Sequence, residues 1–377
     1  MLDYDVVIIG GTITGIYAAI TATKLQGRVA LIEPPPTEIN TVTSPLVGNT
    51  QGFNHNKIIS QIGNFVEQIY HKQQFGIYQG SDDSGEISVK FEEAKKYADY
   101  VVNNQLAKYE PAVLATLGID VIFGEGKFVD RPHLAFVVKG RHLRSRAYLL
   151  ATPSQAIVPK IPGLTSTRFI TPQKIQQLST LPQNLAVIGG DPRGIEIAQS
   201  FSRLGAKVTI VVKSSRILGK EDSEAAFLVQ GQLEAEGIRI LAQTEVSEVR
   251  EIEDKKWILV RNEAIEVDEI ILAAGNKPNL QTLNLEAVGV KFNGYKLFLN
   301  KKLQTNNYRI YGCGDLIGGY SLTHVANYEA EIAIKNILYL PIFSVNYSGI
   351  PWAILSDPQL ARVDRRTTSY LADHIRN

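Results

Sequence analysis

The sequence predicts an α/β fold built from two copies of a strand–turn–helix–strand unit, and three observations lead to this prediction. Residues 4–33 pass from a buried apolar run through a glycine turn to an amphipathic stretch and a second apolar run. The same order returns at residues 185–212. A third glycine turn, Gly314-Asp315, separates a short apolar run from another helical pattern. This alternation is typical of parallel sheets covered by helices.

The composition is that of an ordinary soluble protein of two or three domains. The chain has 377 residues, of which 44% are hydrophobic and 20% are charged, and its formal net charge is +1. Such a charge favours neither nucleic acid nor an acidic membrane surface as a partner. No apolar run approaches the ~20 residues of a membrane span, and the first strand leaves no room for a signal peptide. A single cysteine, Cys313, excludes an intrachain disulfide and a cysteine-based zinc site. We expect a cytoplasmic protein.

The first unit has the spacing of a dinucleotide-binding βαβ element. Asp5–Ile9 is almost wholly apolar, and the turn Gly10-Gly11-Thr12-Ile13-Thr14-Gly15 follows it directly. Apolar residues then recur at helical spacing from Ile16 to Leu25, and the strand Val29–Ile32 ends at Glu33. Glycine lets the backbone approach a pyrophosphate, the helix N-terminus stabilises its charge, and the acid accepts from a ribose hydroxyl.

Thr12 is a departure from this pattern, because it stands where G-x-G-x-x-G has its middle glycine. Its side chain adds bulk where phosphates come close, although its hydroxyl could donate to a phosphate oxygen. The alternative is a tight turn between strand and helix that binds no ligand.

The segment between the two units mixes helices and short strands. Pro34-Pro35-Pro36 is a stiff break, and apolar residues recur at helical spacing from Lys57 to His71. Gln73–Ser88 is rich in Gly, Asp and Ser and predicts a surface loop. Phe91–Leu117 predicts a long helix that is interrupted near Pro111. Strands are expected over 119–123, 124–129, 134–138 and 147–151, before a linker at 159–162.

The second unit repeats the first one. Leu185–Ile188 predicts a strand, Gly189-Gly190-Asp191-Pro192-Arg193-Gly194 a turn, Ile195–Leu204 a helix and Val208–Val212 the next strand. The two turns are too far apart in the sequence to belong to one element. The repeat therefore predicts a protein that holds two nucleotides.

The third turn ends the strand Tyr308–Asp315 and precedes a helix that starts near Thr323 and runs to about Leu338. An acid at a strand end beside a helix N-terminus suits a polyol hydroxyl together with a phosphate. The alternative is that Asp315 only caps a helix.

These motifs, in this order, resemble the pyridine nucleotide–disulfide oxidoreductases. Ala151-Thr152-Pro153-Ser154 with Ile161-Pro162-Gly163 is similar to the family's A-T-G-S…P-x-I-P-G, and Ala273–Asn279 is similar to its A-A-G-R-x-P-N. Thr244-Glu245-Val246 also matches. The resemblance covers nearly the whole chain and implies two Rossmann-like domains of the FAD/NAD(P)-binding fold, the NAD(P) domain being inserted in the FAD domain.

The resemblance also implies domain limits and cofactor contacts. Residues 1–155 and 274–343 would form the FAD domain, 156–273 the NAD(P) domain, and 344–377 a remnant of the interface domain. The residues that would face FAD are Gly10, Gly11, Thr12, Gly15, Glu33, Gly126, Thr152, Ser154, Gly314, Asp315, Thr323 and Ala326. Those that would form the second nucleotide site are Gly189, Gly194, Lys213, Arg216, Val246 and Gly275.

The redox disulfide of the family, C-x4-C-x3-K, is missing. Aligning its lysine on Lys57 puts Gly48 and Phe53 at the two cysteine positions. Without a dithiol, reduction of a disulfide substrate is not expected. Electrons would pass from the flavin directly to a small-molecule acceptor.

Lys57 and Glu196 match a lysine and a glutamate that, by the resemblance, form a catalytic pair beside the flavin N5. The alternative for each is a solvated surface charge. His55 lies next to Lys57 but shows no partner in the sequence, which argues against a catalytic task.

The second nucleotide site departs further from its pattern. Asp191 places a carboxylate where the pyrophosphate should approach. Val212 replaces the ribose-binding acid, and the nearby cations Lys213 and Arg216 favour NADPH over NADH. Alternatively, the domain keeps its fold and has lost its ligand.

Pro351–Val363 resembles the first strand of the family's interface domain, which normally continues much further than Asn377. The chain would then form a different homodimer from the family's, or be a shortened or decayed relative. Two functions result: an FAD-dependent NAD(P)H oxidoreductase, or a degenerate, non-catalytic flavoprotein that acts as a binding or structural module.

Overall fold

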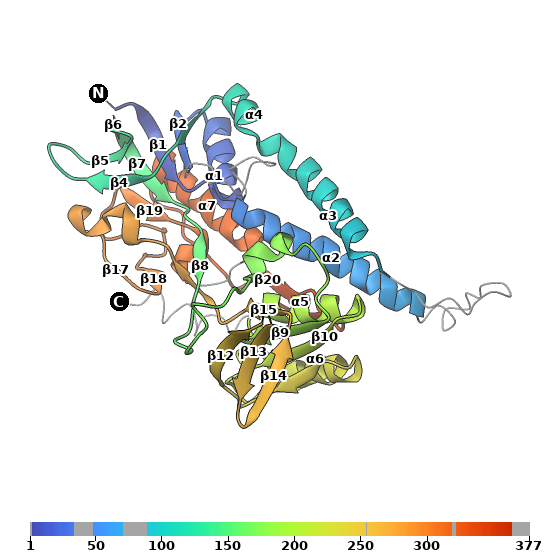
Figure 1. Ribbon diagram of the computed structural model, residues 1–377. Helices are drawn as coiled ribbons and strands as arrows, with labels where there is room; N and C mark the ends of the chain where they lie inside the picture. Colours follow the sequence, from blue (N-terminus) through green and yellow to red (C-terminus); the bar gives the residue numbers. More distant parts are fainter. Residues whose placement is uncertain (1, 34–47, 71–88, 254, 319–321, 364–377) are drawn as a thin grey trace.

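The computed structural model describes residues 2–33, 48–70, 89–253, 255–318 and 322–363. Two parallel sheets organise the chain, and Figure 1 shows them at opposite ends of the molecule, with the long helix α2 (Gly48–Tyr70) between them. The α/β class predicted from the sequence is confirmed.

The first sheet has the strand order β19-β7-β1-β2-β3. All its strand pairs are parallel, and the interior positions of β1, such as Val6, Val7 and Ile8, are fully buried. Both faces are therefore covered, as expected for parallel strands. Helices α1 (Ile13–Lys24) and α7 (Thr323–Leu338) pack together against this sheet. Its strands are β1 (Tyr4–Ile9), β2 (Val29–Glu33), β3 (Ile119–Phe123), β7 (Ser145–Leu150) and β19 (Ile310–Gly312).

The second sheet has the order β11-β10-β9-β15 and is also parallel. Its strands come between β7 and β19 in the sequence. The chain therefore leaves the first sheet after β7, forms the second sheet and returns to the first at β19. Its helices are α5 (Pro192–Arg203) and α6 (Ser223–Ala235). Its strands are β9 (Asn184–Ile188), β10 (Lys207–Val211), β11 (Arg239–Leu241) and β15 (Glu269–Leu272).

Helix α2 lies between the two sheets and contacts other helices. It packs against α3 (Phe91–Leu106), α5 and the 3-10 segment η5 (Pro172–Gln177). The Ser60 and Ser200 hydroxyls are 2.6 Å apart across the α2–α5 contact. The predicted interruption near Pro111 is confirmed: η4 (Ala107–Tyr109) follows α3, and Pro111 starts α4 (Pro111–Thr116).

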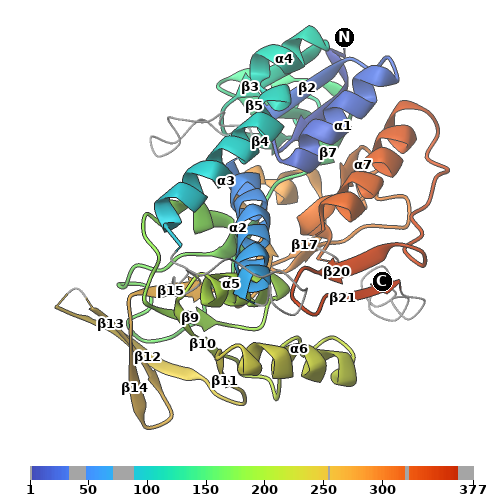
Figure 2. The same ribbon diagram turned by 90° about the vertical axis from the view of Figure 1, so that its right-hand side faces the viewer.

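Smaller sheets complete the fold. A three-stranded sheet of β4, β5 and β6 lies beside the first parallel sheet, and a meander of β12, β13 and β14 lies beside the second (Figure 1). Figure 2 shows the meander from another side. The remaining short strands form two-stranded sheets, and the remaining helical elements are short 3-10 helices. Their bounds are β4 (Gly126–Val129), β5 (Ala135–Val138), β6 (Arg141–Leu143), β8 (Ser154–Ala156), β12 (Val246–Ile252), β13 (Lys255–Val260), β14 (Glu263–Val267), β16 (Asn276–Pro278), β17 (Phe292–Asn293), β18 (Lys296–Leu297), η6 (Gln281–Leu283), η7 (Leu285–Val288) and η8 (Gly314–Ile317).

The described C-terminal segment is an antiparallel hairpin, β20 (Pro351–Ile354) and β21 (Leu360–Val363), and not the single strand that the sequence predicts. The turn forms around Ser356-Asp357-Pro358, whose residues disfavour a continuous strand. Figure 2 shows the hairpin beside α6, against which β21 packs.

Within the described residues, no helix combines the length and the apolar character needed to cross a bilayer. The predicted surface loop 73–88 lies outside the described residues.

Candidate functional site

The first glycine turn, between β1 and α1, can be built only with glycine at its two ends. Gly10 has φ +117°, and an ideal Cβ placed there would lie 2.4 Å from the Ala151 carbonyl oxygen. A Cβ on Gly15 would lie 1.9 Å from the Gly10 carbonyl oxygen. Strand, turn and helix are thus in backbone contact, the close approach that dinucleotide-binding turns require.

Thr12 takes part in the same turn as the N-cap of α1. Its hydroxyl oxygen accepts from the Gly15 amide at 3.1 Å and donates to the Ala151 carbonyl at 3.0 Å. The side chain that departs from the glycine pattern therefore stabilises the helix start. Because its proton is already donated to Ala151, it does not face outward as a phosphate donor.

Glu33, the last residue of β2, is the most unusual group in the first unit. It is 3% exposed, and its carboxyl lies against Gly11, where any Cβ would overlap it. Its Oε2 has no hydrogen-bond partner among the described residues. Burial raises the pKa of Glu33 to about 8, and the Gly11 amide offsets part of this rise. A buried acceptor left without a partner is expected where a ligand hydroxyl completes the site.

The Gly314-Asp315 turn brings together two predicted FAD contacts that are distant in the sequence. The Ser154 hydroxyl donates to Asp315 Oδ2 at 2.5 Å. Gly314 has φ +76°, a conformation that favours glycine, and its amide donates to Glu329 Oε2 at 2.7 Å. The Asp315 carboxyl is therefore held by β8, and the backbone of the turn is held by α7.

Glu329 was missed by the sequence reasoning. It is buried in α7 beneath the turn, and the Tyr347 hydroxyl donates to its other oxygen at 2.9 Å. Burial raises the pKa of Glu329 to about 7, against the effect of these two hydrogen bonds. Nothing in the sequence distinguishes it from Glu331, which forms an ordinary ion pair with Lys335 along the helix.

The other predicted FAD contacts occupy varied positions. Gly126 starts β4, and a Cβ there would lie 2.4 Å from the Phe136 ring. Thr152 donates to the Asn279 carbonyl at 3.4 Å. At the start of α7, Ala326 is buried and Thr323 is exposed.

The second glycine turn, between β9 and α5, repeats the backbone of the first. Gly189 has φ +113°, and its ideal Cβ would lie 2.2 Å from the Ala273 carbonyl oxygen. A Cβ on Gly194 would lie 2.5 Å from Ala273 Cβ. Gly275 follows with φ +98° and accepts the Ile157 amide at 2.9 Å. The backbone again suits a dinucleotide.

Asp191 does not simply project a negative charge from this turn. It caps α5, accepting from the Arg193 amide at 3.1 Å, and its two oxygens accept from Arg193 Nε and Nη2 at 2.8 and 2.9 Å. Burial would raise the pKa of Asp191, but the hydrogen bonds and charge of Arg193 prevail and hold it below its ordinary value. The repulsion expected from the sequence is therefore largely neutralised within the turn.

The cations expected near a 2′-phosphate are engaged with protein groups. Lys213 Nζ is 2.7 Å from Glu245 Oε1 in an exposed ion pair. Arg216 donates to the Glu221 carbonyl at 3.1 Å. Val212 at the strand end is 1% exposed, and Val246 is buried at the start of β12.

Lys57 and Glu196 do not form the expected ion pair within the described part of the chain. Lys57 is exposed, and Glu196 Oε2 accepts instead from Asn56 Nδ2 at 3.3 Å. Successive residues point about 100° apart around a helix, so the face of α2 that turns Asn56 toward α5 turns Lys57 away from it. Glu196 Oε1 accepts the Leu355 amide at 2.9 Å, and burial raises the pKa of Glu196.

His55 has the partner that the sequence did not show. Its Nε2 is 2.5 Å from Asp99 Oδ1 on α3, and the ring is buried. Gly48 and Phe53, at the family's cysteine positions, lie in the first turns of α2, whose side chains are outside the described part. Cys313 is fully buried, and burial raises the pKa of its thiol well above the usual range, so it is a structural cysteine.

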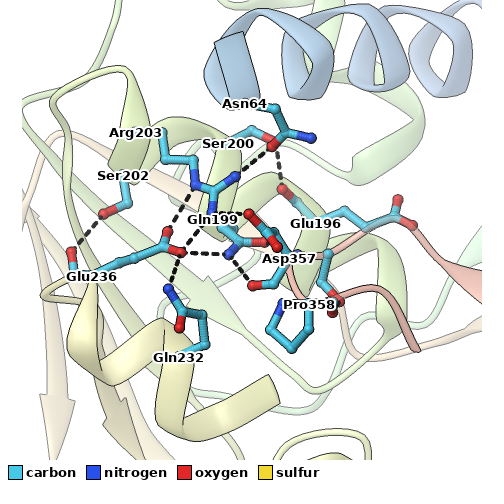
Figure 3. Close-up of polar contacts among 11 residues, drawn as sticks. Asn64, Glu196, Gln199, Ser200, Ser202, Arg203, Gln232, Glu236, Asp357 and Pro358 are labelled. Carbon is cyan, nitrogen blue, oxygen red and sulfur yellow. Dashed lines mark hydrogen bonds and ion pairs between the residues drawn. The ribbon is translucent and has the colours of Figure 1, made fainter. Parts of the chain in front are cut away.

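A polar cluster fixes α5 to its surroundings (Figure 3). Arg203 donates to both oxygens of Glu236 at 2.9 and 2.6 Å, to Asp357 at 2.9 Å and to Asn64 at 2.5 Å. Gln199 bonds both the amide and the carbonyl of Asp357, at 2.8 and 2.7 Å. These contacts join α2, α5, the end of α6 and the C-terminal hairpin, and so fix the helix that carries Asp191 and Glu196.

Comparison with known families identifies the fold. The family model described as "Pyridine nucleotide-disulphide oxidoreductase" matches residues 4–330. The chain belongs to this family. Its single, buried cysteine sets it apart from the disulfide pattern in the family's name.

Several proteins show the same relationship. Mercuric reductase of Staphylococcus aureus is 29% identical over 96% of this chain and 64% of its own length, and the Bacillus cereus mercuric reductase is 29% identical, with 56% of its length covered. Dihydrolipoyl dehydrogenase of Acholeplasma laidlawii is 28% identical over 92% of this chain and 99% of the relative. The flavoprotein disulfide reductase RclA from Escherichia coli, solved as a Cu(II) complex, has a TM-score of 0.79 and 25% identity over 98% of this chain and 80% of RclA.

Proposed function

We propose that the protein is an FAD-dependent NAD(P)H oxidoreductase that passes electrons from reduced flavin directly to a small-molecule acceptor. The observation that supports this best is the buried carboxyl of Glu33 at the end of β2, whose Oε2 has no hydrogen-bond partner among the described residues and which lies next to a turn that requires glycine at Gly10 and Gly15. Its position after the second strand is the one from which an acid accepts a ribose hydroxyl.

The described residues fit FAD. Gly10 and Gly15 would allow the pyrophosphate to approach the backbone, and the N-terminus of α1 would stabilise its charge. Glu33 would bind the adenosine ribose, and the Asp315 carboxyl, oriented by Ser154, would bind the ribityl chain or a phosphate-linked hydroxyl. When bound, FAD would supply two-electron transfer between a nicotinamide and the acceptor.

The absence of a dithiol supports direct transfer. The only cysteine of the sequence, Cys313, is buried with a raised pKa and cannot relay electrons to a disulfide. By their names, the relatives act on mercury or on dihydrolipoyl groups, and RclA is described as a disulfide reductase. For this chain we propose an acceptor that reaches the flavin itself, such as a quinone, a dye-like molecule, oxygen or a metal ion.

The electron donor is proposed to be NADPH or NADH, NADPH being favoured by Lys213 and Arg216. The backbone of the second turn suits a dinucleotide, but Asp191 already takes the amide donor at the start of α5. Glu196 remains the proposed acid beside the flavin, and the exposed Lys57 on α2 remains the proposed catalytic lysine. As members of the family are usually homodimers, we also propose self-association.

A second candidate is a non-catalytic flavoprotein that serves as a binding or structural module. The Asp191–Arg193 pair favours this candidate, because the guanidinium donors of Arg193 are already bonded to Asp191 and are less available to a nucleotide. In that case Glu33 and Asp315 would still hold FAD, and no nicotinamide would reduce it.

An anaerobic titration separates the two candidates. The full chain is loaded with FAD, its visible spectrum is recorded, and NADPH or NADH is added. Bleaching of the flavin band is expected of the oxidoreductase. A yellow protein that neither cofactor bleaches would support the non-catalytic module, and a protein that cannot be loaded with FAD would refute both candidates.

A further inference from the structure

The carboxylate of Asp191 is bound by the kinds of donor that proteins use for phosphate. Its oxygens accept from a backbone amide in the first turn of α5 and from two nitrogens of the Arg193 guanidinium, at 2.8 to 3.1 Å. A helix N-terminal amide combined with a forked guanidinium is a common arrangement for phosphate oxygens. Here the bound anion belongs to the turn itself.

The pair is mostly shielded from solvent. The side chains of Asp191 and Arg193 are each 15% exposed, whereas the Lys213–Glu245 pair nearby is 83% and 64% exposed. Partial desolvation strengthens such an ion pair relative to one on the surface. A dinucleotide that uses this helix end must therefore displace a well-formed internal contact.

Arg193 is held by other residues besides Asp191. The side-chain amide of Asn276, turned with its oxygen toward the guanidinium, accepts from Arg193 Nη1 at 3.2 Å. Burial acts to lower the pKa of Arg193, but the hydrogen bonds and charge of Asp191 raise it, and the charges of Asp315 and Glu196 add a smaller rise. We expect Asn276 and these charges to keep the guanidinium in place when the Asp191 carboxylate is removed.

We propose that Asp191 is an internal substitute for a nucleotide phosphate, which competes with the pyridine dinucleotide for the α5 N-terminus and for Arg193. This inference rests on the proposed function, since it concerns the same second nucleotide site. Asp191 weakens NAD(P)H binding, and Arg193 is the cation that the nucleotide pyrophosphate uses once Asp191 has moved. The two residues together set the affinity of the site.

The test measures binding rather than turnover. NADPH and NADH are titrated into the FAD-loaded full chain by isothermal titration calorimetry, for the wild type and for Asp191→Gly and Asp191→Asn. Asp191→Gly is expected to lower the Kd for both nucleotides about tenfold or more, because the amide and the guanidinium become available. Asp191→Asn should give a smaller gain, since it removes the charge but leaves a capping side chain.

The glycine variant should fold. Asp191 has φ −62° and ψ 135°, which glycine adopts without strain, and glycine at an N-cap costs only a few tenths of a kcal/mol. Asp222 provides a matched control, because it caps α6 by accepting from the Glu224 and Ala225 amides at 3.0 and 3.2 Å. Asp222→Gly should leave the Kd unchanged.

Arg193 is tested in the same series. Arg193→Leu should abolish most of the gain from Asp191→Gly when the two are combined, and Arg193→Lys should keep only part of it, because lysine lacks the fork. An Asp191→Gly variant that binds no more tightly than the wild type, or not at all, overturns the inference. If the gain in nucleotide affinity persists in the double variant with Arg193→Leu, Arg193 is not the cation that binds the nucleotide.

The failure of the proposed function is recognised separately. If the wild-type flavin is not bleached by saturating nucleotide, the natural protein is not an NAD(P)H oxidoreductase, whatever Asp191→Gly does. If the wild type is bleached and the Kd values of the wild type and Asp191→Gly agree, the function holds and the role of Asp191 is refuted.

Discussion

The β1–α1 and β9–α5 turns have nearly the same backbone and differ in what completes them. Gly10 and Gly189 have φ +117° and +113°, and each packs against a carbonyl oxygen of the neighbouring strand segment. In the first turn the cap is the neutral Thr12, and the strand-end acid Glu33 has no described partner at one oxygen. In the second turn the cap is the paired Asp191.

This difference separates the residues that maintain the fold from those that bind a ligand. The glycines are required by backbone contacts that exist without any nucleotide, so both turns keep them. The residues at the cap and at the strand end differ between the two turns: the caps are Thr12 and Asp191, and the strand ends carry Glu33 and Val212. We infer that Glu33 beside the first turn remains available to a cofactor, whereas the helix N-terminus of the second turn is already bonded to Asp191.

We expect the largest loss of stability from a substitution of Gly10, a position at which the two turns have the same backbone conformation. Gly10→Ala forces a Cβ to within about 2.4 Å of a carbonyl oxygen at a φ that alanine rarely adopts. The overlap and the strain should lower the free energy of unfolding by about 3 kcal/mol or more. Chemical denaturation of the apoprotein measures this value.

Gly140→Ala is the control for the glycine prediction. Gly140 has φ +78°, but no atom lies within 4 Å of its ideal Cβ, so only backbone strain remains, about 1 kcal/mol. Equal losses in the two variants would show that the close approach at Gly10 contributes nothing.

The next effect is expected where the turns differ most, at the strand ends. Glu33→Val gives the first turn the residue type that Val212 supplies in the second. Removing a buried carboxyl without a full set of partners should raise the stability of the apoprotein at pH 8 by about 2 kcal/mol. The same change should weaken FAD binding at least about tenfold, as measured by the recovery of flavin fluorescence on dilution.

The ionisation of Glu33 gives the same prediction a pH dependence. Its folded pKa, about 8, is above its unfolded value, so the folded state binds the proton more tightly. Stability should therefore be highest below about pH 4.5 with respect to this group and fall as the pH rises toward 8. The Glu33→Gln apoprotein should lose a large part of this slope, and an unchanged slope would show that Glu33 is not the titrating group.

A smaller effect is expected beneath the Gly314-Asp315 turn. Tyr347→Phe removes one hydrogen bond to the buried Glu329 and should cost about 1 kcal/mol of stability. Glu329→Leu also removes the acceptor of the Gly314 amide, so it should weaken FAD binding more than Tyr347→Phe does. FAD retention after gel filtration compares the two variants, with Glu331→Leu, on the same helix, as the control.

The elements of the fold could be predicted because their signals are local. The apolar runs of β1 and β9, the helical periodicity of α1 and α5 and the break at Pro111 all depend on residues that are close in the sequence. The glycine pattern also predicted both turns. The C-terminal hairpin was missed, because a short polar turn between two weakly apolar runs gives little periodic signal.

The contacts of the candidate site depend on packing that no local pattern encodes. Whether Lys57 or Asn56 meets Glu196 is decided by the rotation of α2 against α5, where one residue shifts a side chain by about 100°. The neutralisation of Asp191 depends on the conformation of Arg193, and the burial of Glu329 in place of Glu331 depends on how α7 lies under the turn. The partners of Glu196 and Asp191, and the burial of Glu329, could therefore not be predicted from the sequence.

The smallest effect is expected at Thr12, and it tests the comparison most directly. Thr12→Gly restores the middle glycine of the first turn, as Asp191→Gly does in the second. Because Thr12 is neutral and its hydroxyl is bonded within the turn, the change should cost only a few tenths of a kcal/mol of stability. It should alter the Kd for FAD by less than about threefold, whereas Asp191→Gly changes the nucleotide Kd about tenfold. If Thr12→Gly tightened FAD binding as strongly, bulk at the middle position would matter more than charge, and the contrast between the two turns would be steric rather than electrostatic.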